Sequence, residues 1–152
     1  MRFLVWFASL VFSLTAHAQD LPKGPSLVNF WASWCKTCLV ELKEYELYQA
    51  KYPTVNLVLV NLDAEKKNAD ALLATLKLRA TIIYDPDFAL AQRYGLDSLP
   101  VSLVLGQDGK VIHVEKGFDP QRSKTEQLFK MAEPPTIKPE PKPTAKSPKV
   151  GP

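Results

Sequence analysis

The two cysteines of this chain, Cys35 and Cys38, have two residues between them and lie where an apolar strand is followed by a helix. The short apolar run 26–31 is typical of a buried strand, and the run 55–62 is another. Between them, residues of one helical face recur every three or four positions, which predicts a helix over about 35–51. These residues are Cys38, Leu42, Tyr45, Tyr48 and Tyr52. A strand, a helix and a second strand in this order favour a right-handed parallel βαβ unit.

The next segments predict two further helices with a short strand between them. Asp63 can cap a helix over 65–78, and the apolar run 81–84 is a strand candidate. The Asp-Pro step at 85–86 then repeats a helix start signal, because Asp suits the N-cap and Pro the first helical position. We expect this short helix to end at Gly95.

The last part of the folded region predicts a hairpin and a final helix. The apolar runs 101–105 and 110–115 flank an Asp-Gly step, which favours a hairpin turn and antiparallel pairing. The Asp-Pro step at 119–120 can open a helix that ends near Ala132. The sum is an α/β protein with a mixed central sheet flanked by helices, in the element order of the thioredoxin fold.

The amino-terminal segment 1–18 has the features of a secretory signal. Arg2 precedes an apolar run of about 12 residues, which is shorter than the roughly 20 residues of a membrane-spanning helix. Ala16-His17-Ala18 fits an A-x-A cleavage site, so we expect cleavage after Ala18. An uncleaved anchor is the alternative, and no cysteine follows Ala18 that could carry a lipid. In an oxidising compartment the two cysteines can form a disulfide, so their redox state matters for function.

The carboxyl-terminal segment 133–152 alternates proline with lysine and has almost nothing apolar to bury. We expect a disordered, extended tail, with a spacer or a contact for acidic surfaces as the alternative. One domain, 19–132, remains between the two ends. The formal charge of +3 arises from those ends, with +1 from Arg2 and +2 from the tail, so this domain is near neutral. Such a charge gives no reason to expect nucleic-acid binding.

The cysteine pair could be a structural staple, a metal site or a reactive dithiol. A disulfide closing so short a loop stabilises by only about 2 kcal/mol, and closed zinc sites take four ligands. After cleavage at Ala18 only His113 could join the cysteines, and we expect that histidine to be a strand residue rather than a catalytic base. A two-coordinate copper(I) site stays possible, because copper(I) prefers soft thiolates.

The position of the pair favours redox cycling. Cys35 falls at the start of a helix, where free backbone N–H groups and the helix dipole stabilise a thiolate. We therefore predict that Cys35 is the nucleophile and that Cys38, one turn further and more buried, attacks the mixed disulfide second. Lys36 adds a nearby positive charge, although it can equally be a solvated lysine.

The segment VNFWASWCKTCLVEL resembles the active-site region of the TlpA/ResA-like periplasmic thioredoxin-like proteins. The similarity extends over about 25–118, including YDPDFALAQRYGLDSLPVSLVLGQDGKVIHVEKGF. The predicted helix and strand within 65–84 match the central αβ insertion that separates this family from plain thioredoxin. The resemblance implies a thiol:disulfide oxidoreductase without a cofactor other than its own Cys35–Cys38 disulfide.

The resemblance also implies roles for residues around the pair. Cys35 corresponds to the attacking and Cys38 to the resolving cysteine. Leu99-Pro100 resembles the cis-proline loop, whose backbone pairs with the substrate and whose proline shields the thiols from metal. Glu41, three places after Cys38, matches the acidic residue that could relay a proton, with a solvated helix glutamate as the alternative.

Three other positions bear on this assignment. Asn29 lies where thioredoxin has a buried aspartate, which leaves Glu41 as the nearby acid. Trp31 is expected in the core, and Trp34 is expected to border the substrate surface. Thr37 departs from the family, which usually has proline before the second cysteine, and the dipeptide Lys36-Thr37 helps to set the reduction potential. Thr37 therefore leaves the direction of electron flow open.

We predict a periplasmic oxidoreductase that reduces disulfides in exported proteins. The resemblance implies clients such as apocytochrome c or copper-site proteins, and re-reduction by a membrane electron donor of the DsbD/CcdA kind. We expect a monomer. The alternatives are a disulfide-forming oxidase of DsbA type, which Thr37 permits, and a copper(I)-binding metallochaperone that uses the same thiolates.

Overall fold

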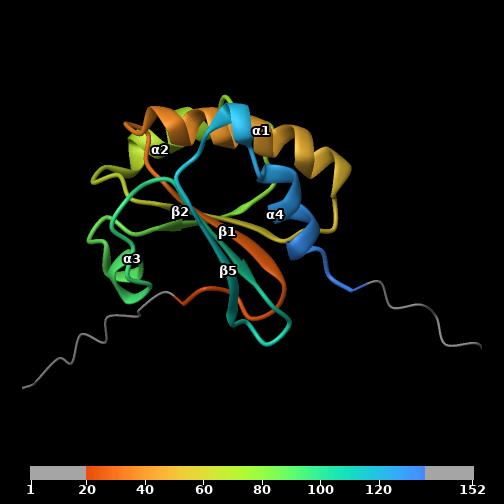
Figure 1. The fold of residues 1–152 in the computed structure, drawn as a ribbon. Helices are drawn as coiled ribbons and strands as arrows, with labels where there is room; N and C mark the ends of the chain where they lie inside the picture. Colours follow the sequence, from red (N-terminus) through yellow and green to blue (C-terminus); the bar gives the residue numbers. More distant parts are fainter. Residues whose placement is uncertain (1–19, 136–152) are drawn as a thin grey trace, which may run out of the picture.

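The computed structural model describes residues 20–135, so the predicted signal segment 1–18 and most of the predicted tail lie outside it. Five strands and four α-helices make up this part of the chain (Figure 1). In order they are β1 (Ser26–Trp31), α1 (Lys36–Lys51), β2 (Leu57–Asn61), α2 (Lys66–Leu73), β3 (Thr81–Tyr84), α3 (Ala89–Arg93), β4 (Val101–Leu105), β5 (Val111–Lys116) and α4 (Thr125–Ala132). A single 3₁₀ turn, Pro120–Arg122, precedes α4.

The strands form one mixed sheet in the order β3-β2-β1-β4-β5. The central strand β1 pairs in parallel with β2 and antiparallel with β4. The parallel pairs come from the helical crossovers, and the antiparallel pair β4–β5 comes from the predicted hairpin. This architecture confirms the predicted α/β thioredoxin fold, with α2 and β3 as the central insertion.

Helices cover both faces of the sheet, which leaves two apolar layers. On one face α1 and α4 pack against alternate residues of the strands, together with part of α2, as Figure 1 shows above the sheet. On the opposite face the short α3 contributes Leu90 and Ala91 to the second layer. The central strand β1 is buried on both faces, and the cysteine motif begins just after its end.

The start of α2 differs from the prediction. Glu65, not Asp63, occupies its N-cap, and the helix ends at Leu73 rather than at 78. Asp63 is buried and instead accepts hydrogen bonds from Ser33 and Asn61. The Asp63 carboxylate binds these donors after β1 and at the end of β2, and it does not cap the helix that follows it.

The start of α3 also differs. The helix begins at Ala89 with Phe88 as its N-cap, not at the Asp-Pro step. Asp85 still satisfies the helix start, because its carboxylate accepts the backbone N–H groups of Leu90 and Ala91 at 3.0 and 2.9 Å. The predicted N-cap position was therefore wrong by three residues, although Asp85 does supply the oxygen atoms that accept N–H groups of the first turn.

The last predicted helix is divided into two pieces. Asp119 accepts the backbone N–H of Gln121 and opens only the 3₁₀ turn, after which the chain breaks at Ser123. The α-helix proper starts at Thr125. Within residues 20–135, no helix combines the length and the hydrophobicity that crossing a bilayer requires.

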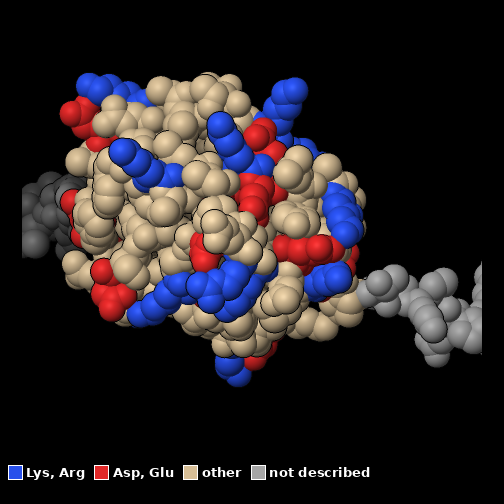
Figure 2. Space-filling model, turned by 45° about the horizontal axis from the view of Figure 1, so that its top comes forward, with Lys and Arg blue, Asp and Glu red and all other residues tan. Residues whose placement is uncertain are grey.

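Acidic and basic side chains are interspersed on the face that carries the helices above the sheet (Figure 2). Many of the charges lie in exposed pairs, such as Lys66 with Asp70 and Lys67 with Glu65. Exposed pairs of this kind contribute little to stability. This face therefore presents mixed charge rather than a field of one sign.

Candidate active site

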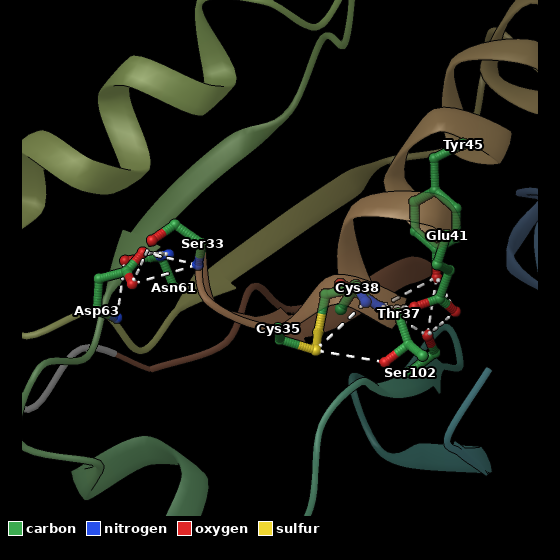
Figure 3. The surroundings of a disulfide bond; sticks show 10 residues. Ser33, Cys35, Thr37, Cys38, Glu41, Tyr45, Asn61, Asp63 and Ser102 are labelled. Atoms are coloured by element: carbon green, nitrogen blue, oxygen red, sulfur yellow. Dashed lines mark hydrogen bonds between the residues drawn. A yellow bond between two sulfur atoms is a disulfide. The ribbon is translucent and has the colours of Figure 1, made fainter.

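Cys35 lies at the N-cap of α1, directly where β1 delivers the chain to the helix. Its Sγ accepts the backbone N–H of Cys38 at 3.3 Å, and the two sulfur atoms form a disulfide (Figure 3). The sulfur thus takes the place that a serine or aspartate oxygen usually fills at a helix start. The same N–H groups and the positive end of the helix dipole would stabilise a Cys35 thiolate after reduction.

The two cysteines differ in exposure. Cys35 retains 8% of its surface, whereas Cys38 is fully buried against the core. Of the two, only Cys35 therefore has exposed surface that a large substrate could reach, and the roles of attacking and resolving thiol stay predictions. The assignment of roles rests on this asymmetry and on the family resemblance.

Cys35 lies on the wall of a groove of about 520 Å³. Trp34 and Leu99 line the same groove, and Trp34 is 64% exposed. The Leu99–Pro100 peptide bond is cis. The structure thus brings Trp34, Cys35 and the proline loop together, while Trp31 is fully buried in the core below them.

Lys36 and Thr37 both face the groove and are exposed. The hydroxyl oxygen of Thr37 lies 3.5 Å from Cys35 Sγ. A proline at this position would offer no donor, so Thr37 adds a polar contact to the sulfur that the usual family residue lacks. Thiolates that accept such contacts are stabilised relative to the thiol.

Glu41 is only 2% exposed, although it is a charged residue type on a helix. Its carboxylate accepts hydrogen bonds from Asn29 Nδ2 at 2.9 Å, from Ser102 Oγ at 3.3 Å and from Tyr45 OH at 3.4 Å. Burial raises the pKa of Glu41 to about 7, and these hydrogen bonds lower it only in part. A carboxyl group with such a pKa can both take up and release a proton near neutral pH.

Sequence reasoning missed two partners of Glu41. Tyr45 lies one turn further along α1, and its hydroxyl is 2.7 Å from Ser102 Oγ. Burial raises the pKa of Tyr45 well above its ordinary value, so the hydroxyl remains a neutral donor. A tyrosine four residues after a buried glutamate, and a lone serine inside the apolar run 101–105, were the available signals.

Asn29 completes this polar cluster in the sheet. It lies directly opposite Ser102 in the antiparallel pair of β1 and β4. Its Nδ2 group contacts Glu41 and Ser102, whereas its buried Oδ1 has no hydrogen-bond partner. The amide therefore presents its donor, not its acceptor, to the carboxylate, which suits an ionised Glu41.

Glu41 also borders a second hollow of about 330 Å³, which the β5–α4 connection lines with Glu115, Lys124 and Thr125. Figure 3 shows Glu41, Tyr45 and Ser102 on one side of the disulfide. The carboxylate thus lies one helical turn from Cys38 and next to a hollow that opens to the surface. This position suits a group that exchanges protons between a buried thiol and solvent.

A second polar cluster lies on the other side of the disulfide in Figure 3. The Asp63 carboxylate accepts the backbone N–H of Ser33 at 3.0 Å, the Ser33 hydroxyl at 2.8 Å and Asn61 Nδ2 at 2.7 Å. These bonds tie the segment just before Cys35 to the end of β2. The sequence predicted Asp63 as a helix N-cap, so the contact of its carboxylate with the segment before Cys35 was missed.

Within the described part of the chain, the cysteines have no third side chain placed with them to ligate a metal ion. Within residues 20–135, no group of three His, Cys, Asp or Glu side chains is placed to hold a metal ion. His113 is half-buried on β5, with its Nε2 3.4 Å from Glu115, and it does not line the groove of Cys35. A hydrolytic Cys-His pair therefore has no geometric support here.

The comparisons with known proteins agree with this geometry. The family model described as Redoxin matches residues 13–129. The thiol-disulfide oxidoreductase ResA of Bacillus thuringiensis is 28% identical over 115 residues, which are 74% of this chain and 66% of the relative. The chain thus spans about two thirds of that relative's length.

Two solved structures are similar over most of the described domain. A Chlorobium tepidum protein assigned as thiol:disulfide interchange protein DsbE shares 32% identity with a TM-score of 0.65, over 72% of this chain and 79% of that one. StoA from Bacillus subtilis shares 26% identity with a TM-score of 0.61, over 74% and 86% of the two chains. The family match covers well over half of the chain and includes both cysteines, and on these grounds the chain belongs to the Redoxin family, in its TlpA/ResA-like branch.

Proposed function

We propose that this protein is a periplasmic thiol:disulfide oxidoreductase that reduces disulfides in exported proteins. One observation carries the proposal. The Cys35–Cys38 pair lies in the first turn of α1, with Cys35 on the wall of an open groove and Cys38 buried beside the polar cluster of Glu41. A structural staple would need neither the groove nor the buried acid.

The cycle begins with the reduced dithiol. The Cys35 thiolate attacks one sulfur of the client disulfide, so a mixed disulfide forms and the other client sulfur leaves as a thiolate that takes up a proton. Cys38 then loses its proton and attacks Cys35 Sγ. This step closes the Cys35–Cys38 disulfide and releases the second client thiolate, so two electrons have passed to the client.

Glu41 supports the second attack. Cys38 is fully buried, so its thiol cannot lose a proton directly to water. The ionised Glu41 carboxylate, one turn away and with a pKa of about 7, can receive that proton. The hollow beside it gives the proton a route to solvent.

The location and the partners follow from the sequence rather than from the described residues. The predicted signal 1–18 supports export to the periplasm. The family resemblance supports apocytochrome c or copper-site proteins as clients, and a membrane donor of the DsbD/CcdA kind that would reduce the pair again. We propose that no further cofactor takes part and that the protein acts as a monomer.

The decisive experiment is the reduction potential of the Cys35–Cys38 couple, followed by tryptophan fluorescence in defined thiol buffers. Trp34 borders the pair and should report its state. A value near or below that of thioredoxin, about −270 mV, is expected for a reductant. A value near that of DsbA, roughly −120 mV, would contradict the proposal and make the protein a disulfide donor.

The contact between Thr37 and Cys35 favours the oxidase as the second candidate. A hydroxyl that donates to the Cys35 thiolate stabilises the reduced protein, and a stabilised reduced form makes the couple more oxidising. The Thr37 contact therefore favours a higher potential than the reductant proposal expects. The measured potential decides between them.

Thr37→Val tests how much this contact contributes. The change keeps the shape of the side chain and removes its hydroxyl, so the reduced form loses a hydrogen bond to an anion, about 1.5 kcal/mol. For a two-electron couple this corresponds to a potential about 30 mV lower. The same variant should raise the pKa of the Cys35 thiol, measured by its thiolate absorbance. An unchanged potential and thiol pKa would show that the hydroxyl does not bind the thiolate.

A further inference from the structure

The groove beside Cys35 has a wall that the family resemblance did not assign. Phe88, just before α3, lines it together with Trp34, and the two aromatic side chains are 42% and 64% exposed. We propose that Trp34 and Phe88 form an aromatic clamp that selects clients with an apolar side chain next to the reactive disulfide. This inference rests on the proposed function and adds a substrate class to it.

The lining of the groove is mostly apolar. Besides the two aromatic rings it includes Leu62, Leu96 and Leu99. Its volume of about 520 Å³ lies within the range of small-ligand sites, so it accommodates a few side chains rather than a folded domain. Covering this surface removes apolar area from water and therefore favours an apolar occupant.

The backbone of Phe88 adopts an unfavourable conformation, which places the aromatic ring at the cost of some stability. Phe88 has φ 59° and ψ 18°, and among residues 20–135 it is the one residue other than glycine with a positive φ. A left-handed conformation is unfavourable for a bulky residue, and such strain concentrates at functional sites. Glycine or asparagine would satisfy this backbone more easily.

The turn that carries Phe88 is fixed at both ends. Its backbone N–H donates to the carbonyl oxygen of Asp85 at 3.0 Å, and its carbonyl oxygen accepts the N–H of Gln92 at 2.8 Å. The Asp85 carboxylate also holds the first N–H groups of α3. The backbone that carries the ring is therefore held by hydrogen bonds on both sides of Phe88.

Charge at the rim does not favour one sign of client. Lys36 and Asp97 both border the groove, and Asp97 pairs with Lys116 at 3.1 Å. The rim thus carries charges of both signs, which leaves apolar contact as the main difference that the groove offers between clients. The position of Cys35 on the same wall fixes which client residues are concerned, because the mixed disulfide places the client cysteine there and its sequence neighbours over the rings.

The test uses two peptides, each closed into a loop by one disulfide and differing only in the residues that flank the cysteines, Leu in one and Ser in the other. The reduced protein is mixed with each peptide, the reaction is stopped by alkylation, and the peptide thiols formed are counted. For the unmodified protein we expect the Leu peptide to react roughly tenfold faster, the effect of burying one such side chain.

Phe88→Asn is the informative variant, because asparagine tolerates the left-handed backbone and removes the ring. Its melting temperature should equal or exceed that of the unmodified protein, while the Leu/Ser rate ratio falls to about threefold or less. Trp34→Ala, on an exposed residue, should lower the ratio in the same way. Leu47→Ala, an exposed apolar side chain of α1 outside the groove, should leave the ratio unchanged.

The outcomes separate this inference from the proposed function. If both peptides are reduced at the same rate, or if Phe88→Asn keeps the full ratio, the clamp is overturned and the oxidoreductase stands. If the reduced protein converts neither peptide, the oxidoreductase itself fails and the clamp fails with it. A ratio that falls in both aromatic variants but not in Leu47→Ala supports the clamp.

Discussion

Replacing Cys38 with serine is expected to stop the cycle at the mixed disulfide. Cys35 remains at the N-cap of α1 and can still attack a client, but no second thiol is present to release it. The variant should accumulate a covalent complex with its clients, and multiple-turnover reduction should fall to the background rate. Non-reducing electrophoresis and mass spectrometry of protein exposed to disulfide clients would measure the complex.

Cys35→Ser is the matched control for this experiment. It retains the buried Cys38, which has no exposed surface to meet a client, so it should form no covalent complex. Equal trapping by the two variants would show that the cysteine roles are wrong. Stronger trapping by Cys35→Ser would reverse them.

Replacing Glu41 with glutamine is expected to slow reduction at neutral pH by roughly 100-fold, which is the lower range for loss of a general acid or base. The loss should fall on the resolving step, so mixed disulfide should accumulate in stopped reactions. In the unmodified protein the rate of this step should rise with pH through about 7, as Glu41 ionises. That pH dependence should be absent in Glu41→Gln. An unchanged rate and pH profile would remove Glu41 from the mechanism.

The same substitution should increase stability at alkaline pH. Because the pKa of Glu41 is about 7 in the folded protein and 4.5 in its ordinary range, the folded state binds the proton more tightly. The free energy of unfolding therefore falls as pH rises from about 4.5 to 7, and the full cost of the buried charge is present above 7. Glu41→Gln should gain about 3 kcal/mol over the unmodified protein at pH 8 and nothing below pH 4.

Denaturant unfolding of the oxidised protein at several pH values would measure this gain. Glu65→Gln is a suitable control, because Glu65 is an exposed carboxylate outside both hollows. It should change neither the reduction rate nor the pH dependence of stability. A variant that is more stable and less active would show that the buried acid is kept for chemistry rather than for folding.

The sequence was sufficient for the fold and for the cysteine pair. Periodicity placed α1 and the strands on either side of it, and the capping position of Cys35 followed from that order. These features depend on residues close in sequence. The predicted roles of Leu99 and Pro100 needed the family resemblance, because spacing alone does not bring residues 35 and 100 together.

The polar clusters around Glu41 and Asp63, on either side of the disulfide, could not be predicted from residues close in sequence. Asn29 and Ser102 meet only because β1 and β4 pair in one particular register, which the sequence does not specify. Asp63 and Asp85 both precede helices and look like caps, yet each carboxylate bonds to atoms that the turn geometry brings near. Phe88 gave no signal, because a left-handed phenylalanine is not expected from any propensity.

The two hollows on this molecule share no lining residue. A client docked over Cys35 would occupy one of them and leave the other, beside Glu41, in contact with water. Electrons would then pass to the client at the hollow of Cys35, and protons would pass to water at the hollow of Glu41. A bulky client could cover the hollow of Cys35 without blocking proton exchange at the hollow of Glu41. The size of a substrate then need not limit the rate of the resolving step that releases it.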